Sequence, residues 1–335
     1  MKNMFFIALI LVSALANAQA PSNAYAIGVD GVKAIEDGEI QEGIKRLKQA
    51  WKMEPATYDY PFEIGRALYL NDQPKKAEKY LYQLQYHTDV QSDLYILLAN
   101  CYKAIDELKK TQDLTRKKEL DALRYGIQKL PEAGILYLEL GKRKLDEGEA
   151  VDALSVFESG IANAPNFTEN YFWAAKLMKA SRNHLWAWIY AELYLNMADD
   201  VEMNRTAARI VAESLEKIHA DSWVADPEQM DQELKFLLAG KCKPTSSGLE
   251  RFVEFRKCLM SEWNTTKFPI ALLLKRSEEI DSQGYLEAYL GSTLLESDKE
   301  AFLPWLASNG ERYEAFRRWR YYNPLMITEP VVRVR

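Results

Sequence analysis

The segment "GEAVDALSVFESGIANAPNFTENYFWAAKLM", from Gly148 to Met178, carries the pattern that decides the fold. It places a small residue, an aromatic residue, a second small residue and a proline in a fixed order, at Ala153, Phe157, Gly160 and Pro165. Small residues let two helices approach closely while large ones fill the space around the contact. A proline then ends the helix. The segment therefore predicts a packed helix followed by a turn into the next element.

The same order recurs along the chain. Counting back from Pro165, further positions with suitable residue types are Tyr137, Leu140 and Gly141. The pattern resembles the tetratricopeptide repeat, in which W-x2-L-G-x2-Y in one helix and A-x3-F in the next recur about every 34 residues. Lys144, at the tyrosine position of that pattern, departs from it. The resemblance implies antiparallel helix pairs that stack into a solenoid.

Five units share this phase, at 24–57, 58–91, 92–133, 134–167 and 168–201. The second helix of the third unit resumes eight residues late, which places an insertion in or near "DELKKTQD" (106–113). We therefore predict an all-α fold, a right-handed α-solenoid of about five tetratricopeptide-like helical hairpins followed by a C-terminal helical module. An ordinary amphipathic bundle is the alternative, but it does not explain a phase shared by five units.

Beyond the repeats the phase is lost. We expect capping helices over 202–243, an all-helical module over 244–325 and a loose tail over 326–335, with a short edge strand as the alternative for the tail. The module is rich in aromatic residues at helical core spacing, which predicts that they are buried. They are Trp305, Tyr313, Phe316, Trp319 and Tyr322.

Residues 1–18 have the features of a signal peptide. Lys2 precedes an apolar run, Met4–Ala16, and Ala16–Ala18 forms an A-x-A cleavage site. The run is shorter than the roughly 20 residues that cross a bilayer, and we expect no membrane span in the mature chain. These features predict export, most simply to a bacterial periplasm or cell envelope. An uncleaved N-terminal anchor is the alternative.

Charge and cysteine content narrow the function further. The net charge is −6, whereas a general nucleic-acid binder is usually basic, so we expect no nucleic-acid partner. Cys101 lies in an apolar helical segment and is expected to be buried. Cys242 and Cys258 could pair in an exported protein. Because Cys258 lies near the far end of the helix that Cys242 precedes, we favour two free thiols, and the pairing stays open.

The sequence offers no catalytic motif. The three histidines, His87, His184 and His219, have no second ligand at metal-binding spacing, and no phosphate loop or nucleophile elbow is present. We therefore predict no enzyme, no cofactor and no metal site.

The resemblance does imply a binding groove. In tetratricopeptide stacks the first helix of each unit lines a concave face, with positions 2, 5, 9 and 12 pointing into it. Here positions 9 and 12 carry five cations and no acid, and position 5 is mainly apolar or aromatic. This predicts a protein or peptide partner, of which an acidic segment is the narrower form, with a solvated face as the alternative. The predicted groove residues are Phe62, Arg66, Tyr69, Asn100, Lys103, Leu138, Lys142, Phe172, Lys176 and Lys179.

These observations favour an exported, non-enzymatic interaction scaffold. One alternative is a docking arm on a C-terminal envelope enzyme or carbohydrate-binding module, which would require Trp305 and Trp319 to line an open cleft beside a carboxylate. Another is a structural subunit of a cell-envelope assembly. The identity of the partner and the oligomeric state do not follow from the sequence.

Overall fold

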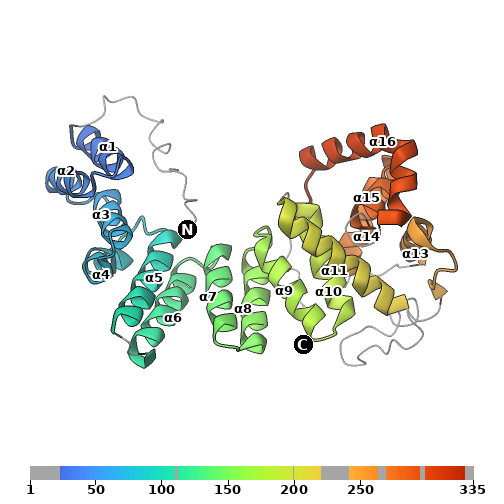
Figure 1. Ribbon diagram of the computed structural model, residues 1–335, viewed down its shortest axis with the longest axis horizontal. Coiled ribbons are helices and arrows are strands. Elements are labelled where there is room, and N and C mark those ends of the chain that lie inside the picture. The colour runs from blue at the N-terminus through green and yellow to red at the C-terminus, as the bar shows by residue number, and fades with distance from the viewer. Residues whose placement is uncertain are drawn as a thin grey trace. The chain divides into compact units, whose positions relative to one another are not determined.

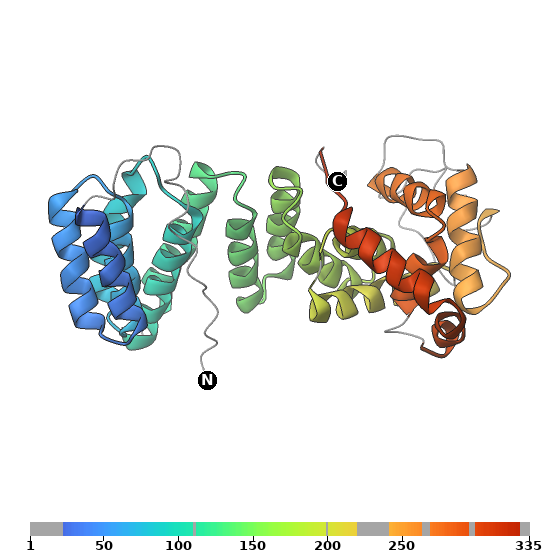
Figure 2. The same ribbon diagram turned by 90° about the horizontal axis from the view of Figure 1, so that it is seen from above.

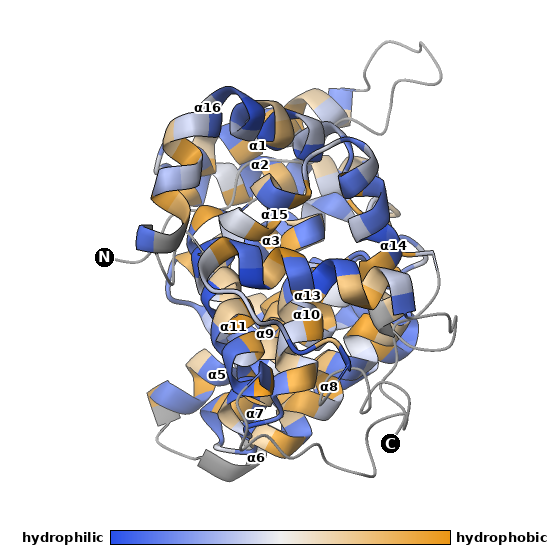
Figure 3. Ribbon diagram, turned by 90° about the vertical axis from the view of Figure 1, so that its right-hand side faces the viewer, coloured by the Kyte–Doolittle hydropathy of each residue, from blue (hydrophilic) through white to orange (hydrophobic). Residues whose placement is uncertain are grey.

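The protein is all-helical over the residues that the structure, a computed structural model, describes (Figure 1). Those residues are 23–109, 112–198, 200–219, 241–262, 269–294 and 299–328. The chain divides into two compact units, unit 1 up to Ala122 and unit 2 from Leu123 onward. Most helices carry both apolar and polar residues, so that one face packs and the other meets solvent (Figure 3). The exception is α10, in which every residue from Leu185 to Asn196 is buried. The predicted signal peptide, at residues 1–18, lies outside the described residues.

Unit 1 consists of antiparallel helix pairs. α1 packs against α2 and α3 against α4, and α3 also contacts α5. Its elements are α1 (Asn23–Glu36), α2 (Ile40–Met53), α3 (Asp59–Leu70), α4 (Pro74–Tyr82), the 3-10 turn η1 (Gln83–Tyr86), α5 (Ser92–Lys109) and the first part of α6 (Gln112–Lys129).

The close contact within each pair is made by a small residue of the first helix. A Cβ atom built on Gly65 would lie 2.5 Å from Cδ2 of Leu81, sixteen residues further on. In unit 2, a Cβ atom on Gly141 would lie 2.3 Å from Cε1 of Phe157, at the same separation. Because real Cβ atoms do not approach so closely, a larger residue at either position would require the facing side chain to move. The contacts confirm the predicted phase and the tetratricopeptide-like solenoid.

The turns inside four of the helical hairpins share one backbone conformation. Four residues at the same position of their repeats have positive φ: Gly38 (87°), Asp72 (53°), Gly148 (79°) and Arg182 (62°). The next residue folds its N–H back onto the first helix, as in the 3.0 Å bond from Glu149 to the carbonyl of Lys144. This left-handed cap ends the first helix and reverses the chain. The repeat therefore extends to the turns as well as to the core.

Unit 2 continues the hairpins and adds further helices (Figures 1 and 2). The Oη of Tyr171 donates a 2.9 Å hydrogen bond to the carbonyl of Pro165, and Tyr137 does the same to Pro131, so each tyrosine ties its helix to the preceding turn. The elements after α6 are α7 (Gly134–Asp146), α8 (Ala150–Asn163), α9 (Glu169–Ala180), α10 (His184–Met197), α11 (Val201–His219), α13 (Gly248–Glu262), α14 (Pro269–Ser282), α15 (Leu286–Leu294) and α16 (Lys299–Tyr322).

The predicted insertion lengthens two helices. α5 and α6 each have 18 residues, against 14 in α1 and α2. Most of the segment 106–113 lies within these two helices, and residues 110 and 111 fall outside the described part of the chain. The extra residues therefore extend the hairpin by about one turn in each helix.

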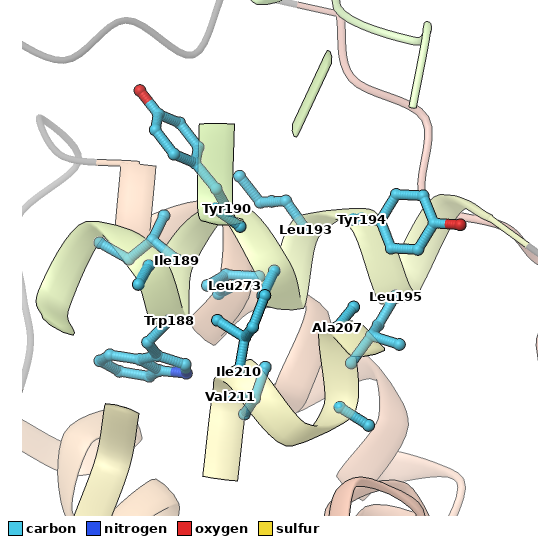
Figure 4. Close-up of a cluster of buried hydrophobic side chains, with 14 of the residues drawn as sticks. Trp188, Ile189, Tyr190, Leu193, Tyr194, Leu195, Ala207, Ile210, Val211 and Leu273 are labelled. Carbon is cyan, nitrogen blue, oxygen red and sulfur yellow. The ribbon is translucent and has the colours of Figure 1, made fainter. Parts of the chain in front are cut away.

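Of the helices after α11, α14 packs against α10 and α15 against α11, while α16 packs against α13 and α15. In Figure 4, Leu273 of α14 lies among Ile210 and Val211 of α11 and Trp188 of α10. The predicted module boundary at 243 and 244 lies inside unit 2, and half of the expected capping segment, residues 220–240, lies outside the described residues.

A buried ion pair joins this layer to the repeats. Arg256 of α13 lies 2.7 Å from Glu192 of α10, and both side chains are 1% exposed. Glu192 also accepts a 2.5 Å hydrogen bond from Tyr289, and Arg256 donates one of 2.6 Å to Ser277. Removing one charge of such a pair leaves the other buried and unpaired, which is strongly destabilising. The network therefore fixes α13, α14 and α15 on α10.

Cys242 and Cys258 form a disulfide, so the expectation of two free thiols is wrong. Their Cα atoms are 5.5 Å apart. The Glu254 carboxylate accepts hydrogen bonds from the backbone N–H groups of Thr245 and Ser246, at 3.1–3.2 Å. These bonds fold the segment before α13 back along that helix. Cys242, in this segment, therefore lies beside Cys258 in the third turn of α13. Cys101 is a free, buried thiol, as predicted.

Two further expectations about the C-terminal part are corrected. Ile327 is 3% exposed, and its N–H and carbonyl both bond the side-chain amide of Asn166, at 2.8 and 3.0 Å, so the tail is not loose at this residue. Residues 329–335 lie outside the described part. Among the five aromatic residues, Phe316 is buried, whereas Tyr322 is 73% exposed because it ends α16 and packs only edge-on against Tyr321. Trp305, Tyr313 and Trp319 are half-buried.

None of the helices in the described part of the chain is long and apolar enough to cross a membrane.

Candidate functional site

The predicted groove residues form two layers on the first helices of the repeats. The position-5 residues Phe62, Leu138 and Phe172 are only 4–6% exposed, so they form a floor rather than a contact surface. The position-9 and position-12 residues above this floor are half-buried: Arg66, Tyr69, Asn100, Lys103, Lys142, Lys176 and Lys179. These residues belong to α3 and α5 in unit 1 and to α7 and α9 in unit 2.

In unit 1, the cation on α3 is already paired. Nη2 of Arg66 lies 2.5 Å from Oε2 of Glu63, one turn earlier on the same helix. Burial raises the pKa of the Glu63 carboxyl, and the neighbouring Arg66 guanidinium lowers it. Tyr69 follows on α3, and Asn100 and Lys103 lie on the adjacent α5. The unit 1 face is therefore polar, with its arginine charge balanced locally.

In unit 2, α9 lies beside both α7 and α11. Lys142 of α7 lies 3.6 Å from Glu139 of the same helix. Lys179 of α9 forms an ion pair with Glu213 of α11, which links the last predicted repeat to the helix that follows it. The Nζ of Lys176 lies 4.1 Å from the centroid of a Trp173 ring, a cation–π contact.

The sequence prediction missed the residues at position 6. These are Glu63, Glu139 and Trp173, and each lies three residues before a position-9 cation. Residues three apart on a helix face each other, so this spacing could have revealed them. The two glutamates reduce the positive field that positions 9 and 12 alone would produce. The tryptophan instead gives unit 2 an aromatic contact surface.

Side chains of the unit 2 face can exchange ion pairs within the protein for ion pairs with a ligand. The Lys142 and Glu139 side chains are 38% and 18% exposed, and ion pairs at such exposure contribute only about 0–1 kcal/mol. A ligand carboxylate can therefore compete with Glu139 for Lys142, while Glu139 keeps its 3.3 Å contact with Arg143. Trp173 is half-buried and stacks on Phe157, with ring centroids 6.1 Å apart, so its orientation is fixed. The face thus offers cations beside a positioned aromatic ring.

The half-buried tryptophans of the C-terminal helices, Trp305 and Trp319, each have an arginine beside the ring. The guanidinium of Arg312 lies 5.9 Å from the Trp305 ring, whose Nε1–H donates a 3.1 Å hydrogen bond to Glu287. Arg276 lies 4.7 Å from the ring of Trp319. Each ring therefore has a charged group over it rather than an open platform for a sugar.

The part of the chain that the structure describes has no group of three or more His, Cys, Asp and Glu side chains arranged to hold a metal ion. His219 is buried at the end of α11, where Arg251 donates a 3.3 Å hydrogen bond to its Nδ1. The Nε2 of His87 lies 2.8 Å from the carbonyl of Ala56.

No family model and no curated protein matches the chain. Among solved structures it is similar to PilF of Pseudomonas aeruginosa, with 15% identity over 58% of this chain and 90% of that one and a TM-score of 0.42. It is also similar to TTC0263, a TPR protein of Thermus thermophilus, with 17% identity over 56% and 99% and a TM-score of 0.39. A third is YrrB, described as a TPR protein with an unusual peptide-binding site, with 14% identity over 55% and 91% and a TM-score of 0.37. The fold assignment rests on the helix packing described above.

Proposed function

We propose that this tetratricopeptide-repeat chain is an exported, non-enzymatic scaffold that binds a protein or peptide segment on the first helices of its repeats. The unit 2 face, formed by Lys142, Trp173, Lys176 and Lys179, is the principal contact surface. It suits an extended or helical segment that carries carboxylates beside apolar side chains.

The observation that carries this proposal is the contact between Lys176 and Trp173. The ammonium group lies 4.1 Å from the ring centroid, and both side chains are half-buried on the face of the first helices. An aromatic ring and a cation held together contact apolar and acidic groups of one ligand at the same time. Lys142 on α7 and Lys179 on α9 add charge on either side of this pair.

Export is supported by two independent features. One is the predicted signal peptide, and the other is the Cys242–Cys258 disulfide, since such bonds persist in oxidising compartments and are rare in the cytosol. A bacterial periplasm or cell envelope fits both. Fractionation of the producing cells tests the location, because a chain retained in the cytosol with residues 1–18 intact would contradict it.

Charge reversal tests the binding surface. The double variant Lys142→Glu, Lys176→Glu should lose the proteins that the wild-type chain captures from the native envelope at low salt, because it repels the ligand's carboxylates. The matched control Lys33→Glu, Lys275→Glu changes the net charge equally at two exposed sites on other helices and should capture as the wild type does. Undiminished capture by the groove variant rejects the proposal.

The carbohydrate-binding alternative receives no support from Trp305 and Trp319, because Arg312 and Arg276 lie over their rings. A structural subunit of an envelope assembly is a narrower form of the same scaffold function. Size-exclusion chromatography of the mature chain distinguishes a free monomer from such an assembly.

A further inference from the structure

The second helices of unit 1 carry an exposed basic surface. α2 and α4 together contain seven basic and two acidic side chains, whereas the whole chain has a net charge of −6. The buried residues of these helices, such as Leu47 and Leu81, face the first helices. The opposite side, which we term the basic face, consists of the exposed residues Lys45, Lys48, Lys52, Lys75, Lys79 and Tyr82.

The basic face is continuous between the two helices. The Nζ of Lys48 on α2 lies 5.7 Å from the centroid of the Tyr80 ring on α4, and the rings of Trp51 and Tyr80 are 6.1 Å apart. Lys45 and Lys79 are 34 residues apart and therefore occupy the same position of successive repeats. The repeat thus aligns the lysine rows of two parallel helices on one side.

The carboxylates of these helices do not neutralise the face. Glu42 pairs with Lys45 at 3.4 Å and with Arg46 at 3.1 Å. Lys52, Lys75 and Lys79 are exposed, and none of the three forms a salt bridge within the described part of the chain. The corresponding second helix of unit 2, α8, has Asp152 and Glu158 and no basic residue, so this charge is not a general property of the fold.

Aromatic side chains accompany the lysines. Tyr82 is 50% exposed, and Tyr86, at the end of the following turn, is 72% exposed. Met53, at the end of α2, is 47% exposed. Tyrosines and long lysines, each with an apolar body and a polar tip, suit the boundary between water and a lipid headgroup layer.

We propose that the basic face binds the surface of an anionic phospholipid bilayer, so that unit 1 holds the scaffold at a membrane. The cations without an ion pair are all lysines, whereas Arg46, the arginine of these two helices, is engaged with Glu42. Lysine acts as a mobile point charge that suits a diffuse anionic surface. The exposed Tyr82 and Tyr86 beside these lysines favour a lipid headgroup layer over an acidic protein as the occupant.

Vesicle sedimentation tests the proposal. The chain without residues 1–18, whose apolar run would bind lipid by itself, is mixed with vesicles of phosphatidylcholine, with or without phosphatidylglycerol, at low and high salt. Binding to the anionic vesicles should exceed binding to the neutral ones by roughly tenfold or more at low salt and fall at high salt. The triple variant Lys45→Glu, Lys52→Glu, Lys79→Glu should bind both vesicle types equally weakly.

The control variant Lys33→Glu, Lys257→Glu, Lys275→Glu has the same net charge but leaves the basic face intact, and should bind like the wild type. Circular dichroism confirms that all variants keep their helices. The groove variant Lys142→Glu, Lys176→Glu should also sediment normally, which separates this proposal from the one above. Equal binding by the two triple variants, or no preference of the wild type for anionic vesicles, overturns it. Binding to polyglutamate without binding to vesicles would assign the face to an acidic protein and equally overturn it.

Discussion

Single residues decide how closely the helices of a pair approach. Phe157 is fully buried against Gly141, and its ring occupies the space that a side chain at Gly141 would need. Phe157 also supports Trp173, whose ring contacts Lys176. The glycine of the repeat pattern is therefore connected to the binding face through two aromatic rings.

Replacement of Gly141 by alanine should destabilise unit 2 by about 1–3 kcal/mol, because the new Cβ would overlap the buried Phe157 ring. Gly310 in α16 is the control, since a Cβ atom there meets no other atom within 4 Å. Gly310→Ala should be neutral or stabilising by up to about 1 kcal/mol. Urea unfolding measures both, and equal effects at the two positions would contradict the tight crossing.

His219 should make the protein sensitive to mild acid. Burial, together with the nearby Arg251 and Lys243, lowers the pKa of His219 from 6.5 to about 4. The unfolded chain then binds the proton more tightly, so the free energy of unfolding falls as the pH drops from about 6.5 towards 4. By pH 5 this loss amounts to about 2 kcal/mol.

The variant His219→Phe keeps a ring against Phe255 and should lose most of this pH dependence between pH 7.5 and 5. A smaller slope should remain, since burial also lowers the pKa of His184. Urea unfolding at the two pH values measures the difference. A variant with the wild-type slope would show that His219 is protonated without cost in the folded chain.

At the scale of elements, the turns inside the helix pairs share one backbone conformation, whereas the segment before α13 is held by contacts of its own. The left-handed turn residue recurs at Gly38, Asp72, Gly148 and Arg182 because these four hairpins reverse at the same point of the repeat. The approach to α13 instead depends on Glu254, which collects the N–H groups of Thr245 and Ser246. This folded-back segment brings Cys242 beside Cys258, and the two form the disulfide.

The disulfide should be detectable by counting thiols. In denaturant without reductant only Cys101 should react, and after reduction all three cysteines should react. Reduction should also lower the melting temperature, because a cross-link that closes a loop of ~15 residues contributes about 3 kcal/mol in the chain-entropy description. Three reactive thiols before reduction would contradict the pairing and remove one support for export.

At the scale of the whole molecule, the sequence predicted the helix contacts that recur with the repeat. The pairing of Gly65 with Leu81 and of Gly141 with Phe157 follows from spacing alone, because every unit solves the same packing problem. The role of Trp173 was not predicted, because it depends on the contact with Lys176 one turn away, which the repeat pattern does not specify. The contact of Asn166 with Ile327 spans 161 residues and leaves no periodic signal. Burial of the position-5 residues depends on neighbouring helices, as the contact of Phe172 with Tyr194 of α10 shows.

The central claim is that the first helices of the unit 2 repeats bind the partner. Site-specific photo-crosslinking tests it most directly, with p-benzoylphenylalanine placed at Trp173 on α9 or at Val151 on α8, which is 82% exposed. In cells that export the chain, we expect a discrete cross-linked partner from position 173 and none from position 151. Cross-linking from position 151 alone, or equally from both positions, would contradict the claim.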